Sequence, residues 1–346
     1  MDKEPLISIV VLNYNAGDLL INCVESLKKS SYHNFEILIV DNISSDNSQT
    51  KCKEKFPDIK LIQNEKNLGY CGGNNVGINH AKGDYIVILN PDTIVDSNWL
   101  KELIFAYEEF GEGLYQPKIL SVNEDNILQS TGNMFHIFGF GYARDKGNKN
   151  SEGTQEIERI GYASGTCLFT SRKVLDQVGL LDEFLFLYHD DLDLGWRAAH
   201  LGISSFYVPK SKIFHVESYS LKWSSKKFYW LERNRKYCLL THYSKKTYKK
   251  MRFTLLVIDF FVWCFYLSRG FLNAKIKAEL DIIRNRDIIE KKYIELENKK
   301  IVSDEEIIKK LPDEIYVPVN VSENSINQMF NSILSRFSKK MKKRII

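Results

Sequence analysis

The chain has 346 residues, of which 44% are hydrophobic and 12% aromatic, so it can bury a substantial core and is not intrinsically disordered. Its length predicts two domains, or one large α/β domain with an appendage. The net charge of +4 gives no overall sign of nucleic-acid binding. Six cysteines without a CxxC pair argue against disulfides and a zinc site, and favour a reducing compartment. The N-terminus has acids before a short apolar run, so we expect no signal peptide there.

Short apolar runs alternate with helical patterns over the first third of the chain. Four runs predict buried strands: Leu6–Leu12, Phe35–Val40, Ile59–Gln63 and Tyr85–Leu89. Apolar residues at helical spacing predict helices over Asp18–Ser30, from Ser44–Asp46 to about Phe56, up to about Lys82, and over Asn98–Phe110. Strands separated by helices at short intervals predict parallel βαβ units and a doubly wound sheet.

Three of these strands end in polar residues. The endings are Asn13-Tyr14-Asn15, Asp41-Asn42 and Asn90-Pro91-Asp92. Ligands bind at the carboxyl ends of strands in open α/β sheets, so we expect a polar cleft there. A carboxylate at this edge can hold a hard divalent cation against a phosphate. The alternative for Asn90-Pro91-Asp92 alone is an ordinary Pro-Asp turn.

The stretch Asn67–Gly77 (NLGYCGGNNVG) predicts a loop that enters a helix. Its backbone and side-chain amides near a helix N-terminus are typical of phosphate or ribose binding, although such a turn needs no ligand. It is not GxGxxG and it follows the third strand, which disfavours a dinucleotide-dependent dehydrogenase. The sequence contains no GxxxxGK[ST], which excludes a P-loop.

From Leu114 onward the pattern is less regular. Residues 139–155 are rich in glycine, asparagine and charge and predict a mobile surface loop. Three further elements are predicted: a strand over Tyr162–Thr170, a short helix over Arg172–Val178 and a strand over Ser204–Val208.

The second chemically dense stretch is Phe184–His200. Asp190, Asp191 and Asp193 follow an apolar run and open a helix, where acids favour the helix dipole. Asp193 can pair with Arg197 four residues on. Two adjacent acids directly after an apolar run are also typical of a general base, because burial raises the pKa of a carboxyl group.

His215 follows a predicted strand. His215 can be a metal ligand only if its imidazole lies near Asp92. The separation of the two residues along the sequence does not show whether it does. We interpret His189 as bracing the acidic stretch. The remaining five histidines have no partner pattern, and we interpret them as ordinary: His33, His80, His136, His200 and His242.

The C-terminal third combines basic and apolar segments. The basic run Lys245–Arg252 precedes residues 253–267, the most apolar segment, which is short for a membrane span and contains Asp259. We interpret that segment as lying against a membrane face, with a buried core helix as the alternative. Residues 274–300 are charged and predicted to be helical, and Ser303 with Glu306 predicts a capping box for the next short helix.

The tail from Ser325 is amphipathic. Its apolar stripe predicts a membrane-surface anchor, with a docking or oligomerisation helix as the alternative. The stripe comprises Ile326, Met329, Phe330, Ile333, Leu334, Phe337 and Met341, and the basic residues are Arg336, Lys339, Lys340, Lys342, Lys343 and Arg344.

Seven motifs, in order over roughly residues 5–240, resemble the family 2 glycosyltransferases of the GT-A fold, particularly rhamnosyltransferase-like enzymes of bacterial surface-polysaccharide assembly. They are VVLNYN (Val10–Asn15), IVDNISSD (Ile39–Asp46), NLGYCGGNNVG (Asn67–Gly77), LNPDT (Leu89–Thr93), SGTCLF (Ser164–Phe169), LDEFLFLYHDDLDLGWR (Leu181–Arg197) and the His215 segment.

The resemblance implies a GT-A domain over residues 1–240, an α/β fold with a mostly parallel sheet and flanking helices, followed by a helical region over 241–346. It implies inverting transfer from a nucleotide-diphosphate sugar, favouring dTDP-rhamnose, to a lipid-linked glycan. A UDP-hexose or UDP-galactofuranose donor is the rival within the class. A sugar nucleotidyltransferase is disfavoured, because NYNAGD is not its Gly- and Arg-rich loop, and an inactive sugar-nucleotide-binding protein is the non-enzyme alternative. We expect a peripheral protein on the cytoplasmic face of the bacterial inner membrane, and homo-oligomerisation stays open.

The resemblance also implies roles for individual residues. Asn13, Asn15 and Asp41 fall where the family contacts base and ribose, and Asn67, Gly69 and Asn74 fall in its donor-binding loop. Asn90 and Asp92 occupy the acidic motif; many members have aspartate at Asn90, so Asp92 is the one secure carboxylate for Mg²⁺ or Mn²⁺, with His215 completing the site. Asp191 aligns with the family's base and Asp190 with its neighbour. Weaker candidates for acceptor or diphosphate contact are Trp196, Arg197, Arg233 and Arg235, although a solvated basic helix is the alternative for the last two.

Overall fold

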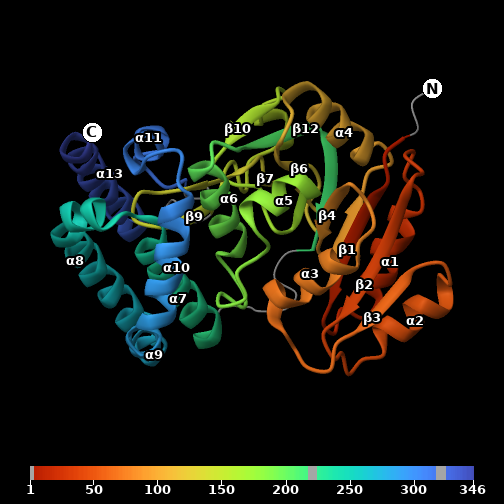
Figure 1. Ribbon diagram of the computed structural model, residues 1–346, viewed down its shortest axis with the longest axis horizontal. Helices are drawn as coiled ribbons and strands as arrows, with labels where there is room; N and C mark the ends of the chain where they lie inside the picture. The colour runs from red at the N-terminus through yellow and green to blue at the C-terminus, as the bar shows by residue number, and fades with distance from the viewer. Residues whose placement is uncertain (1–3, 217–223, 317–324) are drawn as a thin grey trace. The chain divides into compact units, whose positions relative to one another are not determined.

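The computed structural model describes residues 4–216, 224–316 and 325–346 (Figure 1). The chain divides into two compact units. The α/β unit comprises Met1–Asn133, Ala143–Gly195 and Ile203–Tyr219, and the helical unit comprises Met134–Tyr142, Trp196–Gly202 and Ser220–Ile346. The helix α7 (Ser225–His242) therefore belongs to the helical unit, although the domain boundary expected from sequence was residue 240.

A parallel sheet forms the first half of the α/β unit. Its strands are adjacent in the order β3-β2-β1-β4. The strands are β1 (Ile7–Asn13), β2 (Phe35–Asp41), β3 (Lys60–Gln63) and β4 (Tyr85–Leu89), and the helices between and after them are α1 (Asp18–Leu27), α2 (Ser48–Lys55), α3 (Gly69–His80) and α4 (Trp99–Phe110). The predicted doubly wound α/β fold with flanking helices is confirmed, and each strand lies within one residue of its predicted bounds.

The second half of the sheet combines two predicted strands, found as β11 and β12, with strands that the sequence did not predict. Beyond β4 the order continues β11-β6-β12-β10, with β5 paired to β12 and β7 to β6. The elements are β5 (Thr93–Val95), β6 (Gly113–Ser121), β7 (Leu128–Ser130), β10 (Glu158–Ile160), β11 (Cys167–Ser171), α5 (Arg172–Val178), α6 (Asp190–His200) and β12 (Ser204–His215). The strand β6 was missed because its buried positions include Gln116 and Lys118, which break the apolar run.

One further prediction for this region is corrected. Residues 139–155, expected to form a loop, include β9 (Gly141–Ala143), paired with β8 (Asn133–Phe135), and the short helix η1 (Asn150–Glu152). The stretch Asn67–Gly77, expected to be a loop that enters a helix, is helical from Gly69 onward, as part of α3. Its glycines allow close packing: a Cβ at Gly77 would lie 2.3 Å from Cγ1 of Val10 on β1.

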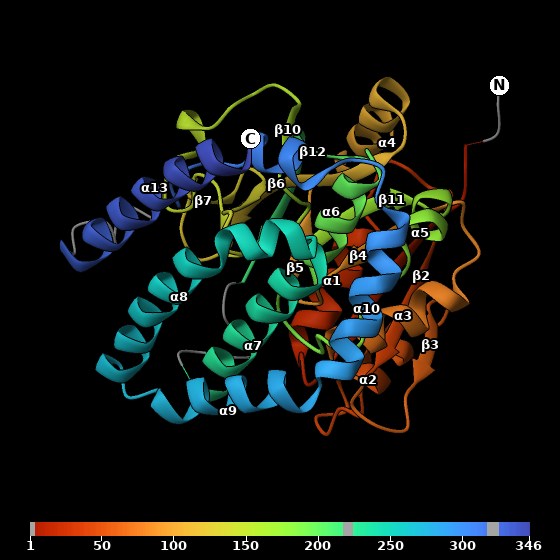
Figure 2. The same ribbon diagram turned by 60° about the vertical axis from the view of Figure 1, so that its left-hand side comes forward.

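The helical unit is built from six described helices (Figure 2). They are α7 (Ser225–His242), α8 (Lys245–Ser268), α9 (Leu272–Arg284), α10 (Arg286–Lys299), α11 (Asp304–Lys310) and α13 (Ser325–Ile345). The helical structure predicted over residues 274–300 is confirmed, and it is divided at Asn285 between α9 and α10. The capping box is confirmed: Ser303 Oγ accepts from Glu306 N at 3.2 Å and donates to the Glu306 carboxylate at 3.3 Å.

A buried ion cluster joins α7, α8 and α9. The ammonium of Lys275 is fully buried and lies 2.6 Å from a carboxylate oxygen of each of three acids, Glu232, Asp259 and Glu279. Arg235 makes a second, bidentate pair with Glu232. Burial alone would raise the pKa of Glu232, but Arg235 and Lys275 lower it to about 2. The cluster fixes Asp259, and with it the middle of α8, inside the helical unit.

Among the described residues, α8 is the one helix whose length and composition would allow it to cross a membrane. One side of α8 is packed: Met251, Ile258 and Val262 are buried. The opposite side carries a stripe of apolar side chains that are 62–73% exposed: Phe253, Leu256, Phe260 and Leu267.

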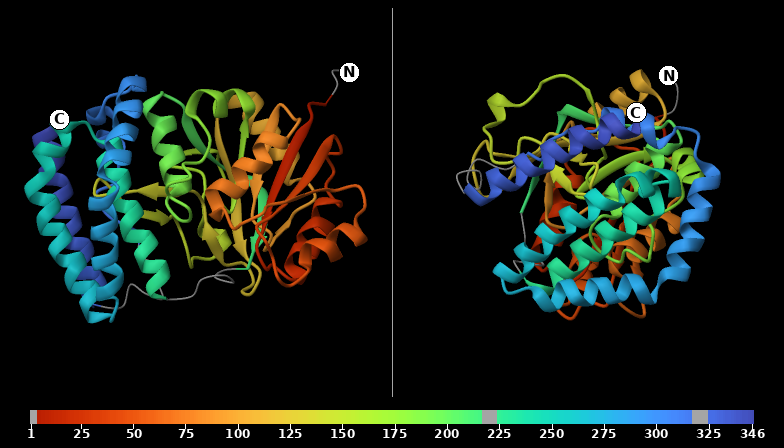
Figure 3. Two further views of the ribbon diagram at one scale, coloured as in Figure 1. Left: turned by 60° about the horizontal axis from the view of Figure 1, so that its bottom comes forward. Right: turned by 90° about the vertical axis from the view of Figure 1, so that its left-hand side faces the viewer.

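The tail helix α13 lies along α8 (Figure 3). Leu334 and Met341, from the stripe predicted to anchor the tail, are buried, and Met341 Sδ accepts from Thr254 of α8. The side chain of Ile326, in the same stripe, lies outside the described residues. These two residues serve docking within the helical unit, the alternative left open by the sequence, whereas Met329 of the same stripe is 56% exposed.

Candidate functional site

The register of the parallel strands aligns three polar side chains at the carboxyl edge of the sheet. Asn13 of β1 is opposite Asp41 of β2, and Asp41 is opposite Gln63 of β3. Asn13 Nδ2 donates to Asp41 Oδ1 at 2.7 Å, and Gln63 Nε2 donates to Asp41 Oδ2 at 2.6 Å. Asn13 and Asp41 are fully buried, so this row of polar side chains lies beneath the surface at the carboxyl ends of the strands.

The loops after β1 and β2 are bound to each other above this row. Asn15 is in the left-handed region, with φ 55°, and its Oδ1 accepts from the backbone N–H of Ser45 at 2.7 Å. Ser44 Oγ accepts from the N–H of Asn15 at 2.9 Å. The two loops predicted to meet base and ribose therefore form one connected polar surface.

The start of α3 is fixed by a backbone contact. Asn67 Oδ1 accepts from Gly69 N at 2.8 Å, and the carbonyl of Phe186 accepts from Tyr70 N at 2.7 Å. Gly69 has φ +71°, and a Cβ there would lie 2.5 Å from the Phe186 carbonyl oxygen. Glycine is thus required where the loop before α6 meets α3.

Asn74 lies one turn further along α3. Its Nδ2 donates to the carbonyl of Tyr70 at 2.9 Å, while its fully buried Oδ1 has no hydrogen-bond partner among the described residues. A buried acceptor without a partner costs free energy, so this atom is available to a ligand donor.

The two acids begin α6 after a strained turn. Phe186, Tyr188 and His189 have φ values of 63°, 68° and 61°, an uncommon conformation for side chains of this size. The turn places Asp191 so that Gly165 N donates to its Oδ2 at 3.0 Å, while Leu192 N donates to Oδ1 at 2.8 Å. Backbone strain of this kind is concentrated at functional sites.

The electrostatics distinguish the two acids. Burial raises the pKa of both carboxyls, and that of Asp190 is raised well above its usual range because the charge of Asp191 adds to the effect. In Asp191 the backbone donors, Gly165 first, oppose the rise. The pKa of Asp190 is therefore raised more than that of Asp191, whose carboxylate the two backbone N–H groups stabilise. The hydroxyl of Tyr70 donates to the carbonyl of Gly165 beside them.

The structure brings His215 to Asp92, which spacing alone did not decide. The antiparallel pairing of β5 with β12 sets His215 opposite Thr93. Nε2 of His215 lies 3.3 Å from Oδ2 of Asp92, and the other carboxylate oxygen, Oδ1, is buried without a hydrogen-bond partner in the described part of the chain.

Asn90 is held through its backbone. Its N–H donates to the carbonyl of Thr166 at 3.0 Å, and its carbonyl accepts from Thr93 Oγ1 at 2.7 Å. Since Gly165 contacts Asp191 and the adjacent Thr166 contacts Asn90, one short loop connects the acidic pair with the strand end of β4.

Sequence reasoning missed Gln129. This residue on β7 contacts His215 at two points: Oε1 lies 2.7 Å from the ring Nδ1, and Nε2 lies 2.9 Å from the backbone carbonyl. No motif surrounds Gln129, and its strand is only three residues long, so the sequence carried no signal for it.

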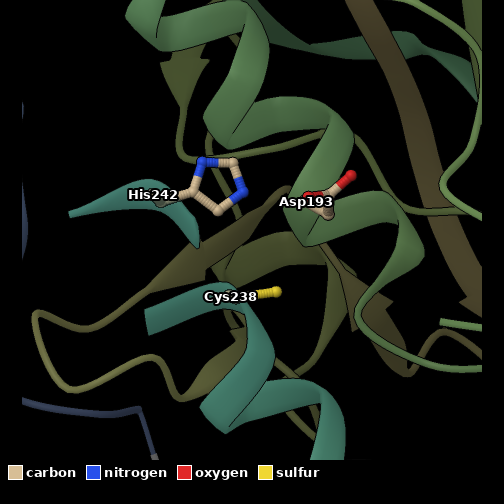
Figure 4. A group of neighbouring side chains, drawn as sticks. All are labelled: Asp193, Cys238 and His242. Carbon is tan, nitrogen blue, oxygen red and sulfur yellow. The ribbon is translucent and has the colours of Figure 1, made fainter. Parts of the chain in front are cut away.

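The four weaker candidates are buried side chains. Trp196 stacks on His242 with ring centroids 4.6 Å apart and belongs to an aromatic cluster of the helical unit. Figure 4 shows His242 and Cys238 on α7 and Asp193 on α6. Arg197 is also buried.

Arg233 and Arg235 do not form a solvated basic surface, which was the alternative for them. Both are at most 4% exposed. Arg233 lies over the ring of Trp230 at 4.7 Å and 3.9 Å from Asp281. Arg235 is paired with Glu232 and Asp259, so its charge is already compensated.

The contact between Gly69 and Phe186 generates a testable prediction. Gly69→Ala should lower the free energy of unfolding by about 2 kcal/mol or more, because both the left-handed backbone and the carbonyl contact oppose a Cβ. The matched control is Gly111→Ala, with φ +79° and nothing within 4 Å of the added Cβ, for which we expect about 1 kcal/mol. Urea unfolding followed by tryptophan fluorescence measures both, and equal losses would remove the contact as a constraint.

Comparison with known proteins gives a family. Residues 8–179 match the profile described as Glycosyl transferase family 2. The low-salt glycan biosynthesis hexosyltransferase Agl10 of Haloferax volcanii is 27% identical over 207 residues, which are 57% of this chain and 63% of that protein. The N-acetylglucosaminyl-diphospho-decaprenol L-rhamnosyltransferase of Mycobacterium tuberculosis is 24% identical over 237 residues, which are 62% of this chain and 77% of that protein.

Solved structures agree on the fold. Staphylococcus aureus TarS (residues 1–349) superposes with a TM-score of 0.51 at 17% identity, covering 97% of this chain and 90% of that one. GalNAc-T7, solved with UDP, GalNAc and Mn²⁺, gives a TM-score of 0.58 at 17% identity, covering 71% and 49%. These structures are likenesses of fold, whereas the matched profile places the domain at residues 8–179 in glycosyltransferase family 2.

Proposed function

We propose that the protein is an inverting glycosyltransferase that moves a sugar from a nucleotide-diphosphate donor to an acceptor hydroxyl. The observation that carries this proposal is the acidic pair at the start of α6. Asp191 is a partly exposed carboxylate with a raised pKa, held by the backbone of Gly165 and Leu192. The pKa of its neighbour, Asp190, is raised further, which favours the neutral form of that acid. This is the arrangement that a general base near neutral pH requires.

Asp191 takes the proton of the acceptor hydroxyl, which is a poor nucleophile until then. General-base catalysis of this kind typically contributes about 10²–10⁴-fold. The acceptor oxygen forms a bond to the anomeric carbon from the side opposite the diphosphate. The bond between that carbon and the diphosphate oxygen breaks, and its electron pair leaves with the diphosphate. One displacement inverts the anomeric centre.

The donor is assigned to the carboxyl edge of the sheet. The polar row from Asn13 to Gln63 and the loop around Asn15 supply hydrogen-bonding groups for base and ribose. The start of α3, from Asn67 to Asn74, supplies backbone N–H groups and the unpartnered Asn74 Oδ1. These roles rest on position and on hydrogen-bonding capacity.

Asp92 and His215 fit a divalent cation, Mg²⁺ or Mn²⁺. The buried, partnerless Oδ1 of Asp92 and the nearby Nε2 of His215 are ligand atoms that such a cation accepts. Asn90 leaves the motif one carboxylate short, so these two residues are the ligands assigned. When bound, the cation would neutralise charge on the leaving diphosphate.

The donor sugar we favour is rhamnose from dTDP-rhamnose, with a UDP-hexose or UDP-galactofuranose as the alternative. The mycobacterial relative, named as an L-rhamnosyltransferase acting on a decaprenol-linked sugar, supports rhamnose and a lipid-linked glycan acceptor. The archaeal hexosyltransferase and a TarS structure in complex with UDP support the alternative.

We also assign the exposed stripe of α8 to the cytoplasmic surface of an anionic membrane. The stripe comprises Phe253, Leu256, Phe260 and Leu267. Lys250 of α8 donates to the carbonyl of Ile345, so the basic start of α8 lies at the basic end of α13. Exposed lysines there (Lys246, Lys249, Lys340 and Lys343) suit acidic lipid headgroups. Because Asp259 is fixed in the ion cluster, α8 would lie on the surface and not cross the bilayer.

The donor assignment is tested by nucleotide release from a panel of dTDP-rhamnose, UDP-glucose and UDP-galactofuranose with decaprenol-linked acceptor. We expect release of dTDP with Mg²⁺ or Mn²⁺, and a loss of at least about tenfold after EDTA treatment or in Asp92→Asn. No release from any donor would contradict transferase activity. Full activity after chelation would contradict the cation.

The base is tested by comparing Asp191→Asn with Asp190→Asn. Asp191→Asn should lower kcat by about 10²–10⁴-fold, whereas Asp190→Asn, which mimics the protonated acid, should cost much less. Since the base works only when ionised, turnover should fall as the pH drops through the raised pKa of Asp191. Equal losses in the two variants would remove Asp191 as the base.

Membrane binding is tested by flotation with phosphatidylglycerol vesicles. The double change Leu256→Ser with Phe260→Ser should weaken binding about tenfold or more, because two exposed apolar side chains are lost. The control is Ile283→Ser with Ile288→Ser, positions on α9 and α10 that are 63% and 50% exposed. Unchanged flotation would contradict the assignment, and conversion of a dimer to monomers by the α8 variant would indicate self-association instead.

A further inference from the structure

Both the oxygen and the nitrogen of the Gln129 side-chain amide contact His215. Its Oε1 lies 2.7 Å from Nδ1 of the imidazole, and its Nε2 lies 2.9 Å from the backbone carbonyl of the same histidine. Gln129 is nearly buried, and so is the ring it contacts. Gln129 is on β7 and His215 is on β12, and both strands pair with β6. The contact therefore depends on the sheet and not on local sequence.

The chemistry of the two contacts determines the orientation of the amide. A backbone carbonyl can only accept a hydrogen bond, so the atom of Gln129 that faces it must be the amide nitrogen. The amide oxygen then faces Nδ1 and can only accept, so Nδ1 must carry a hydrogen. The carbonyl of His215 also accepts from the N–H of Val122 at 3.2 Å, which holds it in place independently.

The consequence appears at the other ring nitrogen. When neutral imidazole carries its hydrogen on Nδ1, Nε2 has a lone pair. That lone pair faces Oδ2 of Asp92 at 3.3 Å. Two acceptors at this distance repel each other unless a positive charge lies between or beside them. The remaining oxygen of Asp92, Oδ1, is buried and has no hydrogen-bond partner among the described residues, so the same place has a second unfilled acceptor.

We propose that Gln129 is a positioning residue that fixes the Nδ1–H tautomer of His215 and so presents Nε2, together with Asp92, to a divalent cation. Histidines that bind metals generally donate their second ring N–H to a carbonyl or carboxylate, and loss of that partner typically costs 10–100-fold in metal affinity. The inference rests on the cation assigned in the proposed function. Gln129 lies outside all seven sequence motifs.

The first measurement is the tautomer of His215 in the cation-free protein. Long-range ¹H–¹⁵N NMR of the histidine rings distinguishes Nδ1–H from Nε2–H, and the His215→Gln variant identifies the signal. We expect Nδ1–H in the unchanged protein and a mixture of tautomers in Gln129→Met, which fills similar space but accepts weakly and cannot donate. An Nε2–H tautomer in the unchanged protein would overturn the proposal, whatever the fate of the variant.

The second measurement is Mn²⁺ affinity, followed by electron paramagnetic resonance of free Mn²⁺ and requiring no turnover. Gln129→Met should bind Mn²⁺ about 10–100-fold more weakly than the unchanged protein. The control, Ser130→Ala, changes the next residue of β7, whose hydroxyl donates to Asn133 and does not contact His215. It should bind Mn²⁺ normally.

The Mn²⁺ measurement tests the role of Gln129 and the presence of the cation site separately. Equal Mn²⁺ affinity in Gln129→Met and the unchanged protein would overturn the role of Gln129 and leave the cation site in place. Absence of saturable Mn²⁺ binding to the unchanged protein would overturn both this inference and the cation assigned in the proposed function, while the base assigned to Asp191 would still stand on its own test.

Discussion

The parallel register of β1, β2 and β4 is the constraint on which the rest of the site depends. It sets Asn13 opposite Asp41 and brings the ends of β1 and β4 to the same edge of the sheet. Side chains that are far apart in the sequence then share hydrogen bonds, because neighbouring parallel strands lie roughly 4.8 Å apart. A shift of one residue would turn this polar row to the other face of the sheet.

Backbone contacts, more than side chains, connect the two halves of the site. The carbonyl of Phe186 binds the start of α3, and the loop at Gly165 contacts both Asp191 and the turn after β4. Three residues in left-handed conformation precede the acids, at a cost of roughly 1–3 kcal/mol each. The surrounding packing must offset this cost. The strained turn holds the carboxylate of Asp191 in a defined position. The same burial that orders the turn also raises the pKa of both acids.

The helical unit handles charge in a different way. Arg235 and Lys275 are buried with acids from three helices, so their charges stabilise an arrangement and are not presented to a ligand. This arrangement explains why a segment as apolar as α8 carries Asp259. The carboxylate fixes one side of the helix, while the other side keeps its phenylalanines and leucines exposed. Removing one partner from such a cluster costs more free energy of unfolding than the intact cluster contributes, because an uncompensated buried charge remains.

The sequence by itself determined the elements whose pattern is local: the four parallel strands, most of the helices, the capping box at Ser303, and the identity of the polar strand endings. The motifs also pointed to Asp191 and Asp92, since their neighbours in the chain carry the signal. Only the tertiary structure brought His215 to Asp92, buried Arg235 together with Leu334 and Met341 of α13, and revealed β6 and Gln129. Those features depend on pairing between strands more than 80 residues apart in the chain or on packing between helices, and neither leaves a periodic trace in the sequence.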